Sequence, residues 1–173
     1  MRSLVTIAVF ATLALPATAL AQTTPPPPPT TNAAQACKAE RTAMGEQTFK
    51  LTYGTNANRS NAFGKCVSKQ RRAQAQARQN SSEACRQERE TLGEAAFNAK
   101  YGKNGNDRNA FGKCVSQETQ AAVQTQQQHT VKAAKACRAE RQTMGTAAFN
   151  AKYGKNRNDR NAFGKCVSET ARG

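Results

Sequence analysis

The sequence predicts an all-α protein made of three small helical modules, each stapled by a disulfide, that follow a signal peptide and a proline-rich spacer. Three observations support this fold class. The octapeptide Asn-Ala-Phe-Gly-Lys-Cys-Val-Ser occurs three times unchanged, at residues 61–68, 109–116 and 161–168. A second cysteine precedes each octapeptide, and 28 residues lie between the two cysteines in every case. Within each unit, apolar residues and glycines follow the spacing of short amphipathic helices.

Residues 1–21 have the three parts of a secretory signal peptide. A charged start, Met1-Arg2-Ser3, precedes an apolar run from Leu4 to Leu15 and the small-residue ending Ala19-Leu20-Ala21. We expect cleavage after Ala21. The run is too short to span a bilayer, and no later run is long enough to be an anchor. The sequence therefore predicts a soluble protein that is secreted, either extracellular or associated with the cell wall.

Residues 22–35 form a spacer rich in proline and threonine. Five consecutive prolines, Pro25 to Pro29, favour an extended polyproline II conformation. The simple interpretation is a stalk. The alternative is a PxxP-type ligand, which would need an aromatic-grooved reader outside the cell.

Three copies of one pattern account for most of the remaining chain. Copy 1 covers residues 36–68, copy 2 residues 84–116 and copy 3 residues 136–168, and the spacing inside each copy never changes. The linkers at 69–83 and 117–135 are rich in Gln, Ala and basic residues and lack proline and glycine. They are predicted to be exposed helices that extend the third helix of each copy, or partly disordered polar spacers. Residues 169–173 form a short tail.

Each copy is predicted to hold three short helices around a core of about six apolar side chains. The first helix covers 33–44 in copy 1 and ends at Gly45, as a C-terminal glycine should. The second carries Phe49 and Tyr53 on one face and ends at Gly54. The third begins after an asparagine-rich loop, with Asn58 (Asn106 and Asn158 in the other copies) as the expected N-cap.

A disulfide inside each copy follows from size and reach. A module this short needs a staple, and closing a loop of this length contributes roughly 3–4 kcal/mol. Across a helical linker, Cys66 and Cys85 would stand about 28 Å apart, too far to bond. The expected pairs are therefore Cys37–Cys66, Cys85–Cys114 and Cys137–Cys166. No CxxC motif is present, which argues against an oxidoreductase.

The residues that could carry enzyme or metal chemistry are few, so we expect no enzyme, no metal and no cofactor. A Glu-Arg pair recurs in each copy and is interpreted as structural, either an internal ion pair or a source of hydrogen bonds to the asparagine loop. A catalytic acid is the functional alternative. His129 is the only histidine and lies outside every copy. The loops at 104–107 and 156–159 resemble calcium loops only faintly. The Glu-Arg pairs are Glu40 with Arg41, Glu88 with Arg89, and Glu140 with Arg141.

The charge is strongly positive, with 26 Lys and Arg against 11 Asp and Glu, for a net charge of +15. Such a field attracts anionic polymers, including cell-wall polymers, acidic polysaccharide and nucleic acid. If the disulfides join the helices as expected, two basic residues meet beside each one and form one basic spot per copy. The alternative is a solvated surface that provides solubility. These residues are Lys38 with Lys65, Arg86 with Lys113, and Arg138 with Lys165.

The pattern Y-G-x-N…N-A-F-G-K-C-V-S resembles a cysteine-containing repeat of uncharacterised secreted proteins of actinobacteria. The resemblance covers 36–68, 84–116 and 136–168, and it implies an exported bacterial protein without adding a catalytic residue. The leading hypothesis is a basic, non-enzymatic repeat protein that binds anionic cell-envelope polymers. The alternatives are a structural or spacer protein of the envelope without a specific ligand, and a nucleic-acid-binding or antimicrobial-type cationic protein. Nothing in the pattern sets an oligomeric state.

Overall fold

A computed structural model describes residues 32–102, 105, 107–154 and 158–172 of the chain. These residues form seven α-helices and no strand, so the all-α prediction is confirmed. The predicted signal peptide and the proline run lie outside the described residues. The helices are α1 (Ala33–Met44), α2 (Glu46–Tyr53), α3 (Ala62–Leu92), α4 (Glu94–Tyr101), α5 (Ala110–Met144), α6 (Thr146–Tyr153) and α7 (Ala162–Thr170).

Both linkers are fully helical. Helix α3 has 31 residues and joins the octapeptide of copy 1 to the first helix of copy 2, while α5 has 35 residues and joins copy 2 to copy 3 in the same way. At 1.5 Å per residue they are about 46 and 52 Å long. The disordered alternative for the linkers is therefore wrong. Only copy 3 has a separate third helix, α7, because in copies 1 and 2 that helix continues through the linker.

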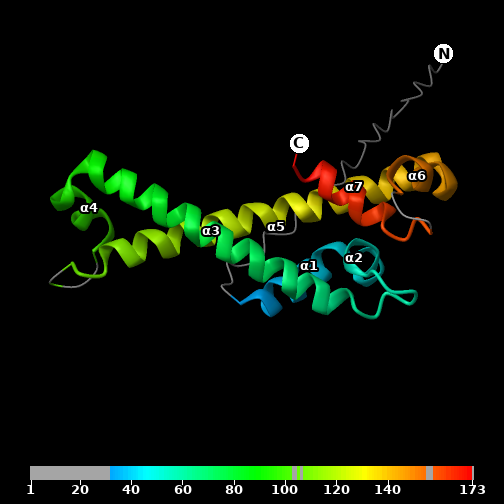
Figure 1. Ribbon diagram of the computed structural model, residues 1–173, viewed down its shortest axis with the longest axis horizontal. Helices are drawn as coiled ribbons and strands as arrows, with labels where there is room; N and C mark the ends of the chain where they lie inside the picture. Colours follow the sequence, from blue (N-terminus) through cyan, green and yellow to red (C-terminus); the bar gives the residue numbers. More distant parts are fainter. Residues whose placement is uncertain (1–31, 103–104, 106, 155–157, 173) are drawn as a thin grey trace, which may run out of the picture.

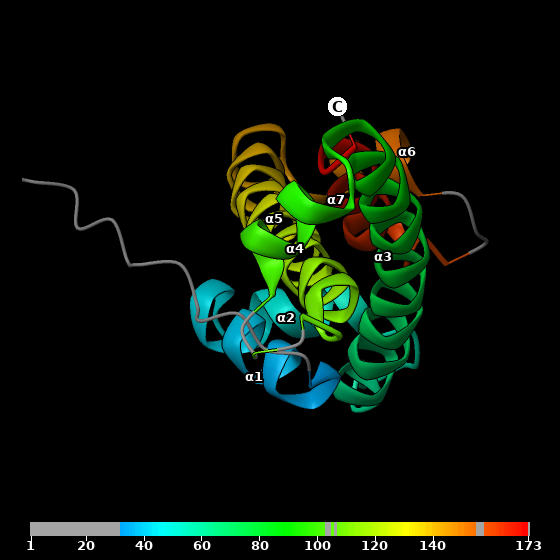
Figure 2. The same ribbon diagram turned by 90° about the vertical axis from the view of Figure 1, so that its left-hand side faces the viewer.

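The two long helices form an antiparallel hairpin that determines the shape of the molecule. Helices α3 and α5 cross and contact each other, and the short helix α4 lies at one end of the hairpin (Figures 1 and 2). At the other end lie α1, α2, α6 and α7 (Figure 1). The chain thus doubles back, so copy 3 packs against copy 1 while copy 2 stands apart.

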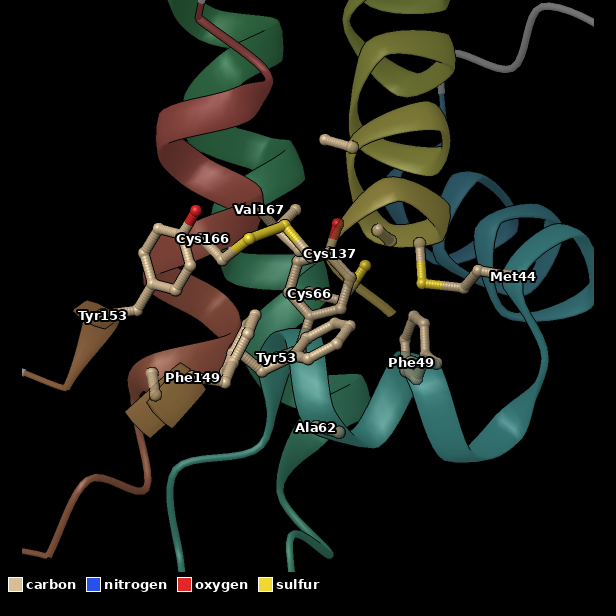
Figure 3. Close-up of a cluster of buried hydrophobic side chains, with 14 of the residues drawn as sticks. Met44, Phe49, Tyr53, Ala62, Cys66, Cys137, Phe149, Tyr153, Cys166 and Val167 are labelled. Carbon is tan, nitrogen blue, oxygen red and sulfur yellow. A yellow bond between two sulfur atoms is a disulfide. The ribbon is translucent and has the colours of Figure 1, made fainter. Parts of the chain in front are cut away.

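Two hydrophobic cores of different size follow from this arrangement. Copies 1 and 3 share one cluster of 15 buried residues, which includes Met44, Phe49, Phe149 and Val167 (Figure 3). The cluster of copy 2 has five buried residues, namely Cys85, Phe97, Tyr101, Ala110 and Cys114. Copies 1 and 3 are therefore stabilised by a larger hydrophobic core than copy 2, although all three share one sequence pattern.

Polar contacts also join copies 1 and 3. The guanidinium of Arg59 donates a hydrogen bond to the backbone carbonyl of Arg160 at 3.1 Å. The Arg138 guanidinium donates to the Thr48 hydroxyl at 3.5 Å. Both bonds span about a hundred residues of sequence, so they depend on the hairpin rather than on local structure.

The glycines that follow the first helix of each copy end it as predicted. Gly45, Gly93 and Gly145 have φ values of 83°, 77° and 81°, a backbone region open to glycine but strained for other residues. Each glycine N–H bonds to the arginine carbonyl four residues before it. The three glycines therefore end these helices at Met44, Leu92 and Met144.

The predicted N-cap at Asn58 is wrong. Helix α3 begins at Ala62, and the residue at its cap position is Asn61. Asn58 instead accepts a bond from the Ser60 N–H at 3.1 Å, which tightens a turn that contains Arg59 at φ 57°. Asn158 makes the same contact with the Arg160 N–H at 3.3 Å, and Asn106 lies outside the described residues. An asparagine side chain can accept a hydrogen bond from the backbone within a turn as readily as at the start of a helix. The recurrence of asparagine in the loop therefore does not show which one is the N-cap.

Candidate functional site

Each copy is built around a buried disulfide, and the predicted pairs are confirmed. The bonds are Cys37–Cys66, Cys85–Cys114 and Cys137–Cys166, with Cα–Cα distances of 6.0, 6.1 and 6.0 Å. All six sulfur-bearing side chains are fully buried, and the described chain has no free cysteine. The cysteines are therefore structural staples in an interior without solvent contact.

A glutamate and a tyrosine meet beside every disulfide. The Tyr101 hydroxyl donates to Glu88 at 2.9 Å, and the Tyr153 hydroxyl donates to Glu140 at 3.0 Å. In copy 1 the Tyr53 hydroxyl donates to Glu40. In all three copies one carboxylate oxygen lies 3.9 Å from the sulfur of the second cysteine. This Glu–Tyr–disulfide cluster fixes the second helix of each copy against the other two.

The expected ion pair between neighbouring Glu and Arg is therefore wrong in all three copies. Glu40–Arg41, Glu88–Arg89 and Glu140–Arg141 form no ion pair in the described structure. Successive residues point about 100° apart around a helix, so the glutamate faces the core and the arginine turns away from it. Arg41 instead lies 3.6 Å from Glu46 and 5.7 Å from the centre of the Phe63 ring. Arg89 lies 5.5 Å from the Phe111 ring in the same way.

The surroundings of the carboxylates differ between copies because their neighbours differ. In copies 2 and 3, Lys100 and Lys152 bond to Glu88 and Glu140 at 2.5 and 2.7 Å, and these bonds lower the pKa of both carboxyls. Copy 1 has Thr52 at the equivalent position, and the fully buried Glu40 takes bonds from Tyr53 and Gln70 instead. Burial raises the pKa of Glu40 to about 7. The same burial, reinforced by the nearby Glu40 charge, raises the pKa of Tyr53.

The three clusters differ in exposure. Glu40 is completely buried, whereas the side chains of Glu88 and Glu140 are 27% and 29% exposed. His129 is exposed on α5, apart from the copies. No group of three or more His, Cys, Asp or Glu side chains gathers anywhere in the described part of the chain. Half of the residues of the two loops that resemble calcium loops, 104–107 and 156–159, lie outside the described residues.

The six predicted anion-contact residues are all exposed. Lys38 and Lys65 follow and precede the two bonded cysteines of copy 1, so the disulfide brings their backbones together. None of the six takes part in the four ion pairs found among the described residues. Arg138 differs from the others because it also reaches Thr48 across the contact between copies 1 and 3. The remaining members of the set are Arg86, Lys113 and Lys165.

A groove between α3 and α5 is a further candidate site, which the sequence analysis missed. It encloses about 680 Å³ beside copy 2. The α3 side chains that line the groove recur at helical spacing within the linker. They form a groove only because α5 packs opposite them. The lining residues are Arg71, Gln74, Ala75, Arg78 and Ser82 from α3, and Phe111, Gly112, Val115, Ser116, Thr119, Gln120 and Val123 from α5.

No described helix has both the length and the apolar character needed to cross a membrane. Three disulfides are typical of proteins that fold in an oxidising compartment. No known protein family, curated protein or solved structure matches the chain. The resemblance to secreted actinobacterial repeats stays a prediction, and the function has to be argued from the geometry of the chain itself.

Proposed function

We propose that the protein is secreted and binds anionic polymers of the cell envelope, without catalysing a reaction. The observation that carries this proposal is the set of six exposed, unpaired cations that flank the disulfides at equivalent positions in the three copies. Cations without a carboxylate partner are available to an external anion. A net charge of +15 adds long-range attraction toward a polyanion.

The hairpin spaces these cations in a way that suits a long polymer. Cys66 and Cys85 stand at two positions of one straight helix, about 28 Å apart at 1.5 Å per residue. Cys114 and Cys137 on α5 are about 34 Å apart by the same measure. The basic spot of copy 2 therefore lies about 30 Å from those of copies 1 and 3. A flexible polyanion that reaches both ends gains avidity, because the second contact becomes intramolecular.

The test is polyanion binding at graded salt with matched variants. The full mature chain should bind purified anionic wall polymer, and its affinity should fall steeply as salt rises because bound counterions are released. Replacing Lys38 and Lys65 with Gln should weaken binding several-fold. The control replaces Lys132 and Lys135, two exposed cations on the α5 linker, with Gln and removes the same charge.

The two variants separate the proposal from its alternatives. Equal losses in both would show that total charge binds and that the spots beside the disulfides have no special part. Absence of retention on any polyanion at low salt would leave a structural or spacer protein as the better interpretation. Duplex DNA serves as the second polyanion, and tighter binding to DNA than to wall polymer would favour the nucleic-acid alternative.

A further inference from the structure

The groove between α3 and α5 has a chemistry different from that of the basic spots. Its α5 wall carries Phe111, Val115 and Val123, so much of its surface is apolar. Its volume of about 680 Å³ is in the range of cavities that hold small ligands, roughly 300–1,000 Å³. An extended polyanion has no apolar part that would use such a wall.

Copies 2 and 3 differ in how far this wall is buried. Phe163 and Val167 of copy 3 are 3% and 1% exposed because they lie in the core shared with copy 1. The equivalent residues of copy 2, Phe111 and Val115, are only partly buried and face the groove. The same two side chains are thus covered more completely in copy 3 than in copy 2, where the Arg89 guanidinium lies over the Phe111 ring.

The polar groups of the groove are suited to an anion. Two guanidinium groups, from Arg71 and Arg78, line it, and no Asp or Glu does. The Gln74 side-chain nitrogen and the Thr119 hydroxyl are buried there without any hydrogen-bond partner. These two atoms are closed to solvent, so a ligand in the groove would not contact them. The exposed Arg71 and Arg78 are the groups that can pair with an oxygen-rich anion.

We propose that this groove binds a fatty-acid carboxylate. The head group pairs with Arg71 and Arg78, and the alkyl chain lies on Phe111 and Val115. A second copy of this chain is a poor occupant, because each molecule carries a net charge of +15 and would bring positive charge against the arginines. A free inorganic anion would leave the apolar wall uncovered.

Calorimetric titration of the full mature chain with dodecanoate tests the proposal. Two probes control for each part of the ligand. Dodecyltrimethylammonium has the same chain with the opposite charge, and acetate has the head group without the chain. We expect saturable one-to-one binding of dodecanoate below its micelle concentration, and at least tenfold weaker binding of both control probes. Equal affinity for the cationic amphiphile would overturn the proposal.

Variants locate the binding. Ala75 is an exposed residue of α3 that lines the groove, so Ala75→Trp should fill the cavity and weaken dodecanoate binding at least tenfold without disturbing a core. The matched control is Gln76→Trp, one residue along and also exposed but outside the lining. Arg71→Gln with Arg78→Gln should weaken binding about tenfold, whereas Arg72→Gln with Lys132→Gln should leave it unchanged.

Two further outcomes would contradict the proposal. Unchanged dodecanoate affinity in Ala75→Trp would place the ligand elsewhere. A concentration-dependent dimer in sedimentation that Ala75→Trp abolishes would show that a second chain occupies the groove. Neither result bears on the envelope-polymer proposal, because wall-polymer affinity depends on other residues and should be the same in Ala75→Trp and the parent chain.

Discussion

The carbonyl oxygen of Thr52 in α2 lies only 2.9 Å from the position that a Cβ on Gly164 of α7 would occupy. This close approach joins copy 1 to copy 3. Gly64 and Gly112 occupy the same octapeptide position in the other copies, and a Cβ on either would meet nothing within 4 Å. The glycine of the octapeptide therefore has a packing role in copy 3 that it lacks in copies 1 and 2.

Adding a methyl group at these glycines should have opposite effects. Gly164→Ala should destabilise the fold by about 1–3 kcal/mol, because backbone at 2.9 Å cannot yield as a flexible side chain would. Gly112→Ala should stabilise it by up to about 1 kcal/mol, since alanine is the better helix former. Urea unfolding of both variants measures the difference. Equal effects would mean that α2 and α7 do not meet as described.

A second matched pair tests whether copies 1 and 3 share a core. Met44 is 5% exposed and packs in the shared cluster, whereas its equivalent Met144 is 37% exposed. Met44→Ala should cost about 2–3 kcal/mol of unfolding free energy through the cavity it leaves. Met144→Ala should change that free energy by less than about 0.5 kcal/mol. Thermal unfolding monitored by circular dichroism would separate them, and equal losses would contradict the shared core.

Copy 2 should depend on its disulfide more than the other copies do. Removing the bond by Cys85→Ala with Cys114→Ala costs about 3.6 kcal/mol in the chain-entropy model. Because only three other buried residues, Phe97, Tyr101 and Ala110, surround this disulfide, α4 should then open locally while α6 stays folded. Hydrogen exchange followed by mass spectrometry reports on both helices. The prediction fails if α4 keeps the same protection as α6 in this variant.

The buried carboxyl of copy 1 should give stability an unusual pH dependence. The pKa of Glu40 is about 7 in the folded chain against 4.5 for an ordinary glutamate. Between these values the folded state holds a proton that the unfolded state has released, so stability falls as pH rises, by up to about 1.4 kcal/mol per pH unit. Glu40→Gln should remove this slope. Urea unfolding from pH 4.5 to 7 measures it.

Glu88 provides the control of opposite sign. Lys100 lowers the pKa of Glu88, so this carboxylate stabilises the fold above its ordinary pKa and loses that effect as pH falls through its folded pKa. Glu88→Gln should leave the slope between pH 4.5 and 7 intact and reduce the loss of stability in acid. A wild-type chain whose stability does not fall between pH 4.5 and 7 would show that Glu40 is not held neutral.

Local features of this fold could be predicted from the sequence because they depend on short-range rules. Glycine after a helical stretch ended α1 at Met44, as expected from its backbone freedom. The within-copy disulfides followed from reach alone, since Cys66 and Cys85 lie on one rigid helix. The spacing of Phe49 and Tyr53 predicts that they share one helix face, and both are buried.

Features that depend on contacts distant in sequence could not be predicted. The partner of Glu40 is decided by which residues surround it in space, and Gln70 comes from the linker. The merger of copies 1 and 3 depends on the crossing of α3 and α5, which no single copy encodes. The groove beside Phe111 has the same origin, because its two walls belong to different helices. Identical octapeptides therefore gave no indication of their different surroundings.

The hairpin also limits how this protein could change in length. In an open stack of repeats each unit meets only its neighbours in sequence, so units can be gained or lost at the ends or the middle. Here copy 1 is covered by copy 3, which comes two units later. A further unit inserted between copies 2 and 3 would move copy 3 away from copy 1 and expose Met44 and Phe163 to solvent. The number of units is thus coupled to the integrity of the main core, as in a closed ring rather than an extendable array.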